Sequence, residues 1–129
     1  MNSQRFTSGL EKLHEIDGEA GKTVIDSLQS IAPDLAKYTI EFPFGDIYQR
    51  PGLDLQKREL VTVAALAALG HCQPQLRVHT HGALNVGCQP DEIVETVIQM
   101  TVYAGFPAAL NAMFTVKEVF IERGIIETE

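Results

Sequence analysis

The side chain best placed for proton chemistry is His79. In a helix it lies in line with Leu76 and Ala83, on the same side as an apolar stripe. An inward-facing histidine can transfer protons when a carboxylate supports it, because the imidazole ionises nearest to neutral pH. It can instead be a core histidine bonded to a backbone carbonyl, and spacing alone favours that structural role.

Glu59 is the carboxylate that could support it. It begins a strongly apolar segment and lies in line with Val63 and Leu66. A buried carboxylate can relay a proton to a histidine. Lys57 and Arg58, in the same turn, can instead solvate the carboxylate, and the residues favour neither interpretation.

Arg50 and Arg58 are the candidates for holding an anionic group. A guanidinium is planar and binds a carboxylate through two parallel hydrogen bonds. Arg50 lies in the turn 50–53, where a structural salt bridge explains it equally well. The spacing of the four histidines predicts no metal site, and no nucleotide-binding or other cofactor motif is visible; these histidines are His14, His71, His79 and His81.

Cys72 and Cys88 are the two cysteines that a thiol-redox reaction would need. A helix between them would separate them by ~20 Å, whereas a disulfide needs about 4.4–6.8 Å between Cα atoms. We therefore expect no bridge within one subunit. Cys88 precedes a helix opened by Pro90, and this position favours a thiolate. A packing role, in which each cysteine fills a gap as a small apolar residue, explains both cysteines better than a redox role.

The elements that position these residues are predicted to be helices throughout, since no segment alternates with a period of two. The expected helices cover residues 7–16, 19–31, 33–49, 55–69, 74–87, 90–103 and 107–123. Pro43 and Gly45 predict a kink in the third. The chain is therefore interpreted as one all-α domain, 1–129, of six or seven helices.

Two of these helices carry more apolar residues than one face requires. The helix 55–69 is apolar on all sides, which is typical of a buried central helix. The last helix has an apolar surplus that we expect to lie partly against another subunit; it comprises Leu110, Met113, Phe114, Val116, Val119 and Phe120.

The composition sets outer limits on function. The net charge of −7 over 129 residues argues against nucleic acid as a partner, though a local arginine can still hold a small anionic substrate. No apolar run approaches the ~20 residues that a bilayer requires, and no secretory signal is visible. Two cysteines are too few for a disulfide scaffold, so we expect a cytoplasmic protein.

The segment 44–53, together with His79 and the run Tyr103-Ala104-Gly105-Phe106-Pro107, resembles the signature of the carboxymuconolactone decarboxylase family. The resemblance covers about residues 31–119. It implies the alkylhydroperoxidase D-like fold and a homo-oligomer, a trimer or a hexamer. It also implies that His79 transfers the proton and that Glu59 is its relay partner. The run 103–107 has a structural explanation, in which the glycine permits close backbone approach and the proline starts the next helix, and Tyr103 is a further candidate for contact with the substrate.

Two positions depart from the patterns of that fold. The decarboxylases carry an arginine where this chain has His81, which lies about 200° around the helix from His79. We expect His81 to have a surface or subunit-contact role. The alkylhydroperoxidase D proteins carry a Cys-x-x-Cys pair, and counting from His79 places its second cysteine at Gln75 and its first at Cys72.

The resemblance implies a cofactor-free decarboxylase of the 4-carboxymuconolactone type that acts on a small carboxylated lactone or related acid. His79 would donate the proton, with Glu59 as partner and Arg50 or Arg58 as the anion clamp. Two alternatives stay open: a peroxidase-like or thiol-redox protein that uses Cys72 or Cys88, and a non-catalytic member of the fold that binds a small ligand.

Overall fold

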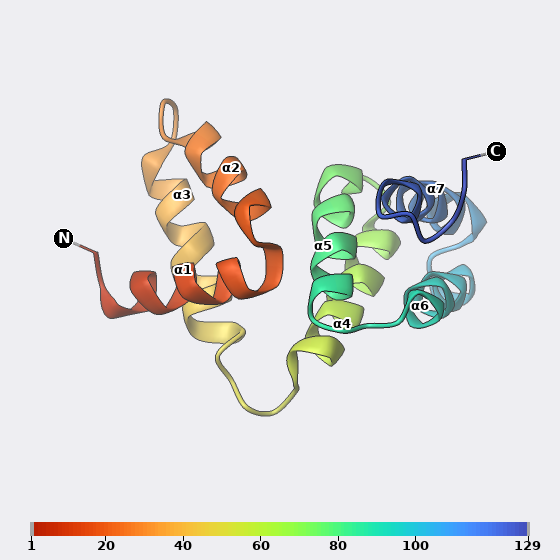
Figure 1. Cartoon of the computed structure of the whole chain (residues 1–129), viewed down its shortest axis with the longest axis horizontal. Coiled ribbons are helices and arrows are strands. Elements are labelled where there is room, and N and C mark those ends of the chain that lie inside the picture. The colour runs from red at the N-terminus through yellow and green to blue at the C-terminus, as the bar shows by residue number, and fades with distance from the viewer. Residues whose placement is uncertain (1, 129) are drawn as a thin grey trace. The chain divides into compact units, whose positions relative to one another are not determined.

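The computed structural model describes residues 2–128, and every regular element in that range is a helix (Figure 1). The all-α fold class is therefore confirmed. The described residues group into two compact units, one up to Leu55 and one from Gln56 onward, while the single domain over 1–129 stays a prediction. No helix among the described residues is long and apolar enough to cross a membrane.

The first unit contains four helical elements: α1 (Gln4–Asp17), α2 (Glu19–Leu28), α3 (Pro33–Thr39) and the π-helix η1 (Ile40–Ile47). Ser3 caps α1, since its hydroxyl accepts a hydrogen bond from the Phe6 amide at 3.0 Å. The same hydroxyl donates to the buried carboxylate of Glu41. This cap therefore attaches the start of α1 to η1.

The kink that the sequence predicts at Pro43 is a change of helix type in the structure. The predicted single helix over 33–49 is α-helical only to Thr39 and π-helical from Ile40 to Ile47. Pro43 has no amide hydrogen to donate, so the α-helical pattern is interrupted there. The Tyr48 amide instead donates to the Pro43 carbonyl at 2.8 Å, across five residues, which is the π-helical spacing.

Two glycines let α1 approach η1 closely. A Cβ atom on Gly9 would collide with the Ile40 carbonyl, and one on Gly45 would collide with the Arg5 carbonyl. Arg5 also binds Asp46 through two nitrogens, with distances of 2.9 and 2.7 Å. This hydrogen bond lowers the pKa of Asp46 and raises that of Arg5. Backbone packing and an exposed ion pair thus join the same two helices.

The second unit contains four α-helices: α4 (Leu55–Leu69), α5 (Gln73–Asn85), α6 (Pro90–Tyr103) and α7 (Phe106–Glu122). The bounds of α4 and α6 are those that the sequence predicts. Gly70 follows α4 with φ 80°, and Gly87 follows the end of α5 with φ 102°, conformations that glycine adopts without strain. These turns fold the four helices back on one another.

The core of the second unit draws side chains from all four helices. Its buried members include Val63 and Ala67 of α4, Leu76 and Ala83 of α5, Ile93 and Val97 of α6, and Ala112, Val116 and Phe120 of α7. These positions recur at intervals of four or seven residues along each helix, so each helix presents one apolar face.

The prediction that the helix 55–69 is buried on all sides is wrong for the described chain. Only Glu59, Val63 and Ala67, which lie four residues apart on one face, are buried. Val61 and Leu69 are each 59% exposed. Apolar composition predicted burial, but the neighbouring helices of the unit cover only one side of α4.

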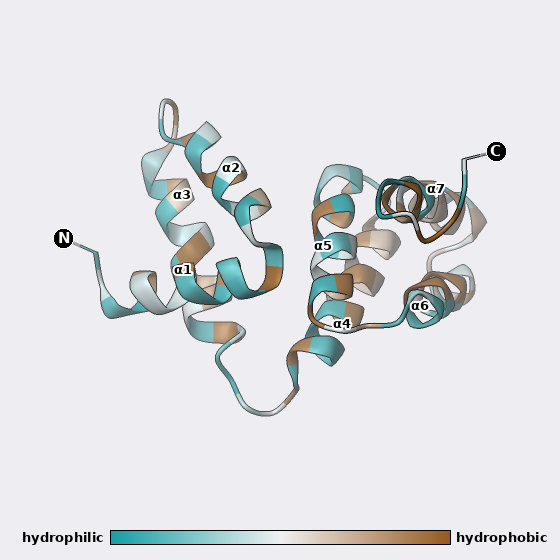
Figure 2. Cartoon of the chain, viewed as in Figure 1, coloured by the Kyte–Doolittle hydropathy of each residue, from teal (hydrophilic) through white to brown (hydrophobic). Residues whose placement is uncertain are grey.

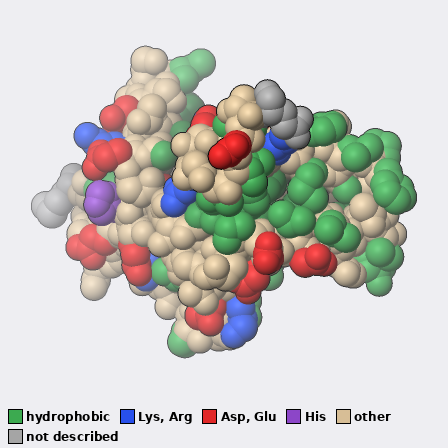
Figure 3. All heavy atoms as spheres, turned by 45° about the vertical axis from the view of Figure 1, so that its right-hand side comes forward, with side chains coloured by type: hydrophobic (Ala, Val, Ile, Leu, Met, Phe, Trp, Pro, Cys, Tyr) green, Lys and Arg blue, Asp and Glu red, His purple; other side chains and the backbone are tan. Residues whose placement is uncertain are grey.

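Other large apolar side chains are also exposed on α6 and α7. They are Ile98, Val102, Tyr103, Phe106, Leu110 and Phe114. The colouring by hydropathy shows the apolar character of α7, and the space-filling view shows hydrophobic side chains gathered on one part of the surface (Figures 2 and 3). Of the surplus predicted for the last helix, Val116, Val119 and Phe120 are buried, whereas Leu110 and Phe114 are exposed.

Candidate active site

The second unit brings His79 of α5 against Glu59 of α4. The distance between His79 Nδ1 and Glu59 Oε2 is 3.0 Å. The Glu59 side chain is fully buried, and the His79 side chain is 18% exposed. The predicted contact between the two groups is confirmed, although they are 20 residues apart in the chain.

Helical periodicity explains why both side chains point inward. Glu59 precedes Val63 and Ala67 at intervals of four residues on the one buried face of α4. His79 lies in line with the buried residues Leu76 and Ala83 on α5. The apolar stripes that pack the two helices therefore also carry the imidazole to the carboxylate.

This arrangement suits proton storage. Because Glu59 faces Nδ1, the ring can donate from Nδ1 to the carboxylate whether His79 is neutral or doubly protonated. Among residues 2–128, none donates a hydrogen bond to the other carboxylate oxygen, Oε1, which is also buried. A buried carboxylate oxygen is normally satisfied by a proton, a water molecule or a ligand donor.

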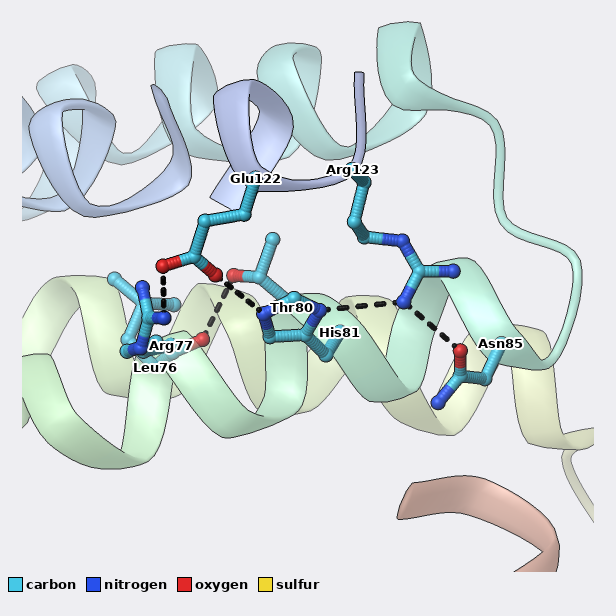
Figure 4. Close-up of polar contacts among 7 residues, drawn as sticks. All are labelled: Leu76, Arg77, Thr80, His81, Asn85, Glu122 and Arg123. Atoms are coloured by element: carbon cyan, nitrogen blue, oxygen red, sulfur yellow. Dashed lines mark hydrogen bonds and ion pairs between the residues drawn. The ribbon is translucent and has the colours of Figure 1, made fainter. Parts of the chain in front are cut away.

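His81, two residues further along α5, faces the end of α7 instead. Its Nε2 lies 3.2 Å from Glu122 Oε2, and its Nδ1 lies 3.2 Å from an Arg123 nitrogen (Figure 4). Glu122 also pairs with Arg77, and Arg123 donates to Asn85 at 3.0 Å. The expectation that His81 points away from His79 is confirmed. It belongs to a partly exposed polar network between α5 and α7.

The side chains expected to bind substrate have different surroundings. Arg58 is partly buried and directly precedes Glu59 on α4. Arg50 is exposed in the turn after η1, where its amide donates to the Ile47 carbonyl at 3.1 Å. Tyr103, at the end of α6, is 83% exposed. Their roles in binding stay predictions.

The two cysteines stand at opposite ends of α5, and neither forms a disulfide. Cys72 is partly buried at the N-cap position, with Gln75 exposed in the first turn. Cys88 is buried, and its thiol donates to the Gln56 carbonyl at 3.3 Å. The helix between them separates them by ~20 Å, so the structure offers no dithiol pair within the chain.

Sequence reasoning missed the role of Gln56. Its side-chain amide donates to the Val86 carbonyl at 3.1 Å, just beyond α5. Gly87 was a signal that could have pointed to it, because a Cβ atom there would lie 2.7 Å from Gln56 Nε2. In the sequence, Gly87 only ends the predicted helix 74–87.

Two hollows on the surface have linings that do not include His79. One is in the first unit, between α1 and α2, beside Leu10, Leu13 and Lys22. The other lies between α4 and α6, beside Leu60, Val61 and Gln99. The predicted pocket around His79 therefore stays a prediction. Within residues 2–128, no three His, Cys, Asp or Glu side chains gather as a metal ion would require.

Comparison with known proteins gives a consistent result. The chain is 36% identical to the 4-carboxymuconolactone decarboxylase of Acinetobacter baylyi over 125 residues, which is 96% of this chain and 92% of that protein. It is 30% identical to an uncharacterised 15.0 kDa protein of Paracoccus denitrificans, covering 92% of this chain and 90% of that one. A nitrosuccinic acid decarboxylase of Metarhizium robertsii is 36% identical over 78 residues, covering 60% of this chain and 54% of that protein.

The family profile runs from the start of α3 into α7 and includes both residues of the buried pair. It matches residues 33–118. Together with the all-helical fold and the relative that aligns over nearly the whole chain, this match shows that the protein belongs to the carboxymuconolactone decarboxylase family.

Proposed function

We propose that the protein is a cofactor-free decarboxylase that acts on a small carboxylated lactone or a related acid. The observation that carries this proposal is the buried pair of His79 and Glu59, with Nδ1 and Oε2 at 3.0 Å. Family membership and two relatives named as decarboxylases support it. The pair supplies one proton in a sheltered place, which is what such a reaction asks of the protein.

The proposed reaction breaks one C–C bond and forms one C–H bond. The carboxylate leaves as carbon dioxide, and the electron pair of the broken bond delocalises into an electron-withdrawing group on the substrate. A proton then adds to carbon and completes the product. The substrate therefore serves as its own electron sink, and the protein holds it, excludes water and delivers the proton.

In this scheme His79 enters the cycle doubly protonated. Because Nδ1 faces Glu59, transfer to the substrate carbon falls to the Nε2 proton. Glu59 stabilises the charged ring before transfer and keeps it oriented afterwards. The buried Oε1 of Glu59 is a suitable acceptor for the next proton on its way back to the histidine.

A carboxylate of the substrate can be bound by a cation that does not protonate it. Arg58 is the nearest candidate along the chain, because it is partly buried and adjacent to Glu59 on α4. We keep Arg50 as the second candidate and Tyr103 as a further substrate contact. A guanidinium stays charged at every relevant pH, so it can hold a carboxylate throughout the reaction.

The substrate class follows from the chemistry that the two named relatives share. The names of two relatives point to nitrosuccinic acid and 4-carboxymuconolactone. Both are carboxylic acids with an electron sink, a nitro group or an unsaturated lactone, that can delocalise the electron pair left when carbon dioxide departs. Both are also small and carry a second carboxylate. We therefore propose a small dicarboxylic acid of this kind as the substrate.

We also propose that the protein acts as a homo-oligomer, a trimer or a hexamer. The exposed apolar side chains of α6, α7 and α4 support this, because such a surface favours contact with another subunit. Light scattering should show an assembly at micromolar concentration, and Phe114→Glu should weaken it. A monomer under these conditions would contradict the proposal.

The activity is tested by incubating the protein with 4-carboxymuconolactone and following ultraviolet absorbance. We expect turnover by the wild type and by His14→Ala, a control that removes an exposed histidine of α1. Turnover should nearly vanish in His79→Gln. Absence of turnover in the wild type would exclude 4-carboxymuconolactone as the substrate. Full activity of His79→Gln would refute the proton-transfer role of His79.

A further inference from the structure

Gln56 makes two contacts between the first turn of α4 and the residues that follow α5. Its side-chain amide donates to the Val86 carbonyl at 3.1 Å. Its main-chain carbonyl accepts a hydrogen bond from the Cys88 thiol at 3.3 Å. Gln56 is itself exposed, so nothing about its burial requires these contacts.

The local backbone explains why the glutamine fits there. The last carbonyl groups of a helix have no partner within the helix, and Val86 occupies the C-cap position of α5. Gly87 then turns the chain with φ 102°, and a Cβ atom at that position would lie 2.7 Å from Gln56 Nε2. A glycine at 87 therefore leaves the space that the glutamine side chain occupies.

The contact also fixes how α4 lies along α5. Gln56 meets Val86, and three residues later along α4 Glu59 meets His79, which is seven residues earlier in the chain. The two helices are thus antiparallel and touch at two polar points. A slide of α4 by one turn, about 5.4 Å, would break both contacts together.

We infer that Gln56 is a positioning residue for the active pair: it sets the axial register of α4 against α5 and so keeps Glu59 on His79. The inference rests on the proposed function of that pair. Gln56 acts through Glu59 and does not itself contact the reacting atoms. Cys88 reinforces the same register through its thiol.

The test measures the Glu59–His79 hydrogen bond directly. In protein labelled with ¹⁵N-histidine, the Nδ1 proton of His79 is identified by its loss in His79→Gln, and its exchange with water is measured. We expect Gln56→Ala to speed exchange about two- to tenfold, the effect of losing one hydrogen bond that holds the register. Gly87→Ala should also speed exchange, because its added Cβ atom would collide with the Gln56 side chain.

Two further variants make the result specific. Gln56→Lys keeps a long side chain that ends in a donor, so it should restore slow exchange. Gln99→Ala, which removes another exposed glutamine, should leave exchange unchanged. The inference would be overturned if the His79 Nδ1 proton exchanged as slowly in a folded Gln56→Ala protein as in the wild type. It would also be overturned if Gln56→Lys failed to restore slow exchange.

An activity measurement separates this inference from the proposed function. If the wild type turns over 4-carboxymuconolactone, Gln56→Ala should lower kcat by a similar factor and leave KM unchanged. A wild type without turnover would count against the proposed function alone, because the exchange experiment still decides the role of Gln56.

Discussion

Two histidine–carboxylate contacts, two residues apart on α5, have different surroundings. His79 approaches Glu59 at 3.0 Å, and His81 approaches Glu122 at 3.2 Å. The Glu59 side chain is fully buried, whereas 44% of the Glu122 side chain is exposed. Similar residue types at similar distances therefore meet in an apolar interior in one case and near solvent in the other.

The two rings also use opposite nitrogens. His79 presents Nδ1 to its carboxylate, whereas His81 presents Nε2 and accepts at Nδ1 from Arg123. A guanidinium can only donate, so Nδ1 of His81 is the acceptor in the contact with Arg123. The contacts of His81 suit a structural link, and the contact of His79 with Glu59 suits a proton donor.

The largest expected effect is on His79. Replacing it with alanine should lower kcat/KM by about 10²–10⁴, the usual cost of losing a positioned acid or base. His81→Ala should stay close to the wild type in the same assay. A large loss of kcat/KM in both variants would show that burial of the histidine–carboxylate contact does not distinguish a catalytic histidine from a structural one.

Glu59→Gln should have the next largest effect. The amide keeps the shape of the side chain but cannot stabilise a charged ring, so kcat should fall about ten- to a hundredfold. Glu122→Gln is the matched variant at the exposed pair and should not change kcat. Equal losses in the two variants would argue against a special role for the buried carboxylate.

A smaller effect concerns acid stability at the exposed pair. The Arg77 guanidinium, which bonds to Glu122, lowers the pKa of that carboxyl below its ordinary value. Its stabilising effect is therefore present above the ordinary glutamate range and is lost as the pH falls through the lowered pKa. In urea unfolding at pH 7, the free energy of unfolding should be higher for the wild type than for Glu122→Gln. The difference between the two should become smaller at acid pH and in about 1 M salt.

The smallest expected effect is that of removing a thiol. Cys72→Ser should retain the activity of the wild type, because the buried pair and not a dithiol cycle carries the proposed chemistry. The assay used for His79→Ala decides this. Loss of activity in Cys72→Ser with activity retained in His79→Ala would favour the thiol-redox interpretation.

The sequence predicts much of the fold because its helix limits are chemically marked. Pro90 opens α6 at the predicted residue, and Gly70 follows the predicted end of α4. Burial was less predictable: the apolar composition of α4 says nothing about how many neighbours cover it. The π-helix was also missed, since proline indicates an interruption but not its geometry.

The site could be predicted in part for a related reason. His79 and Glu59 each lie in line with apolar residues, so their meeting in the core could be anticipated. The partners of His81 could not, because Glu122 and Arg123 lie about 40 residues away, on and just after α7, with no pattern that links them to α5. Gln56 is exposed, and exposed glutamines carry no periodic signal.

The π-helix has a consequence for how this chain tolerates insertions and deletions. Each π-helical turn holds about one residue more than an α-helical turn. Loss of a single residue between Ile40 and Ile47 would therefore allow α-helical winding, and it would rotate Glu41 and Phe44 away from their buried positions. A relative that is α-helical here should align with a one-residue gap, together with a compensating change in which side chains face α1.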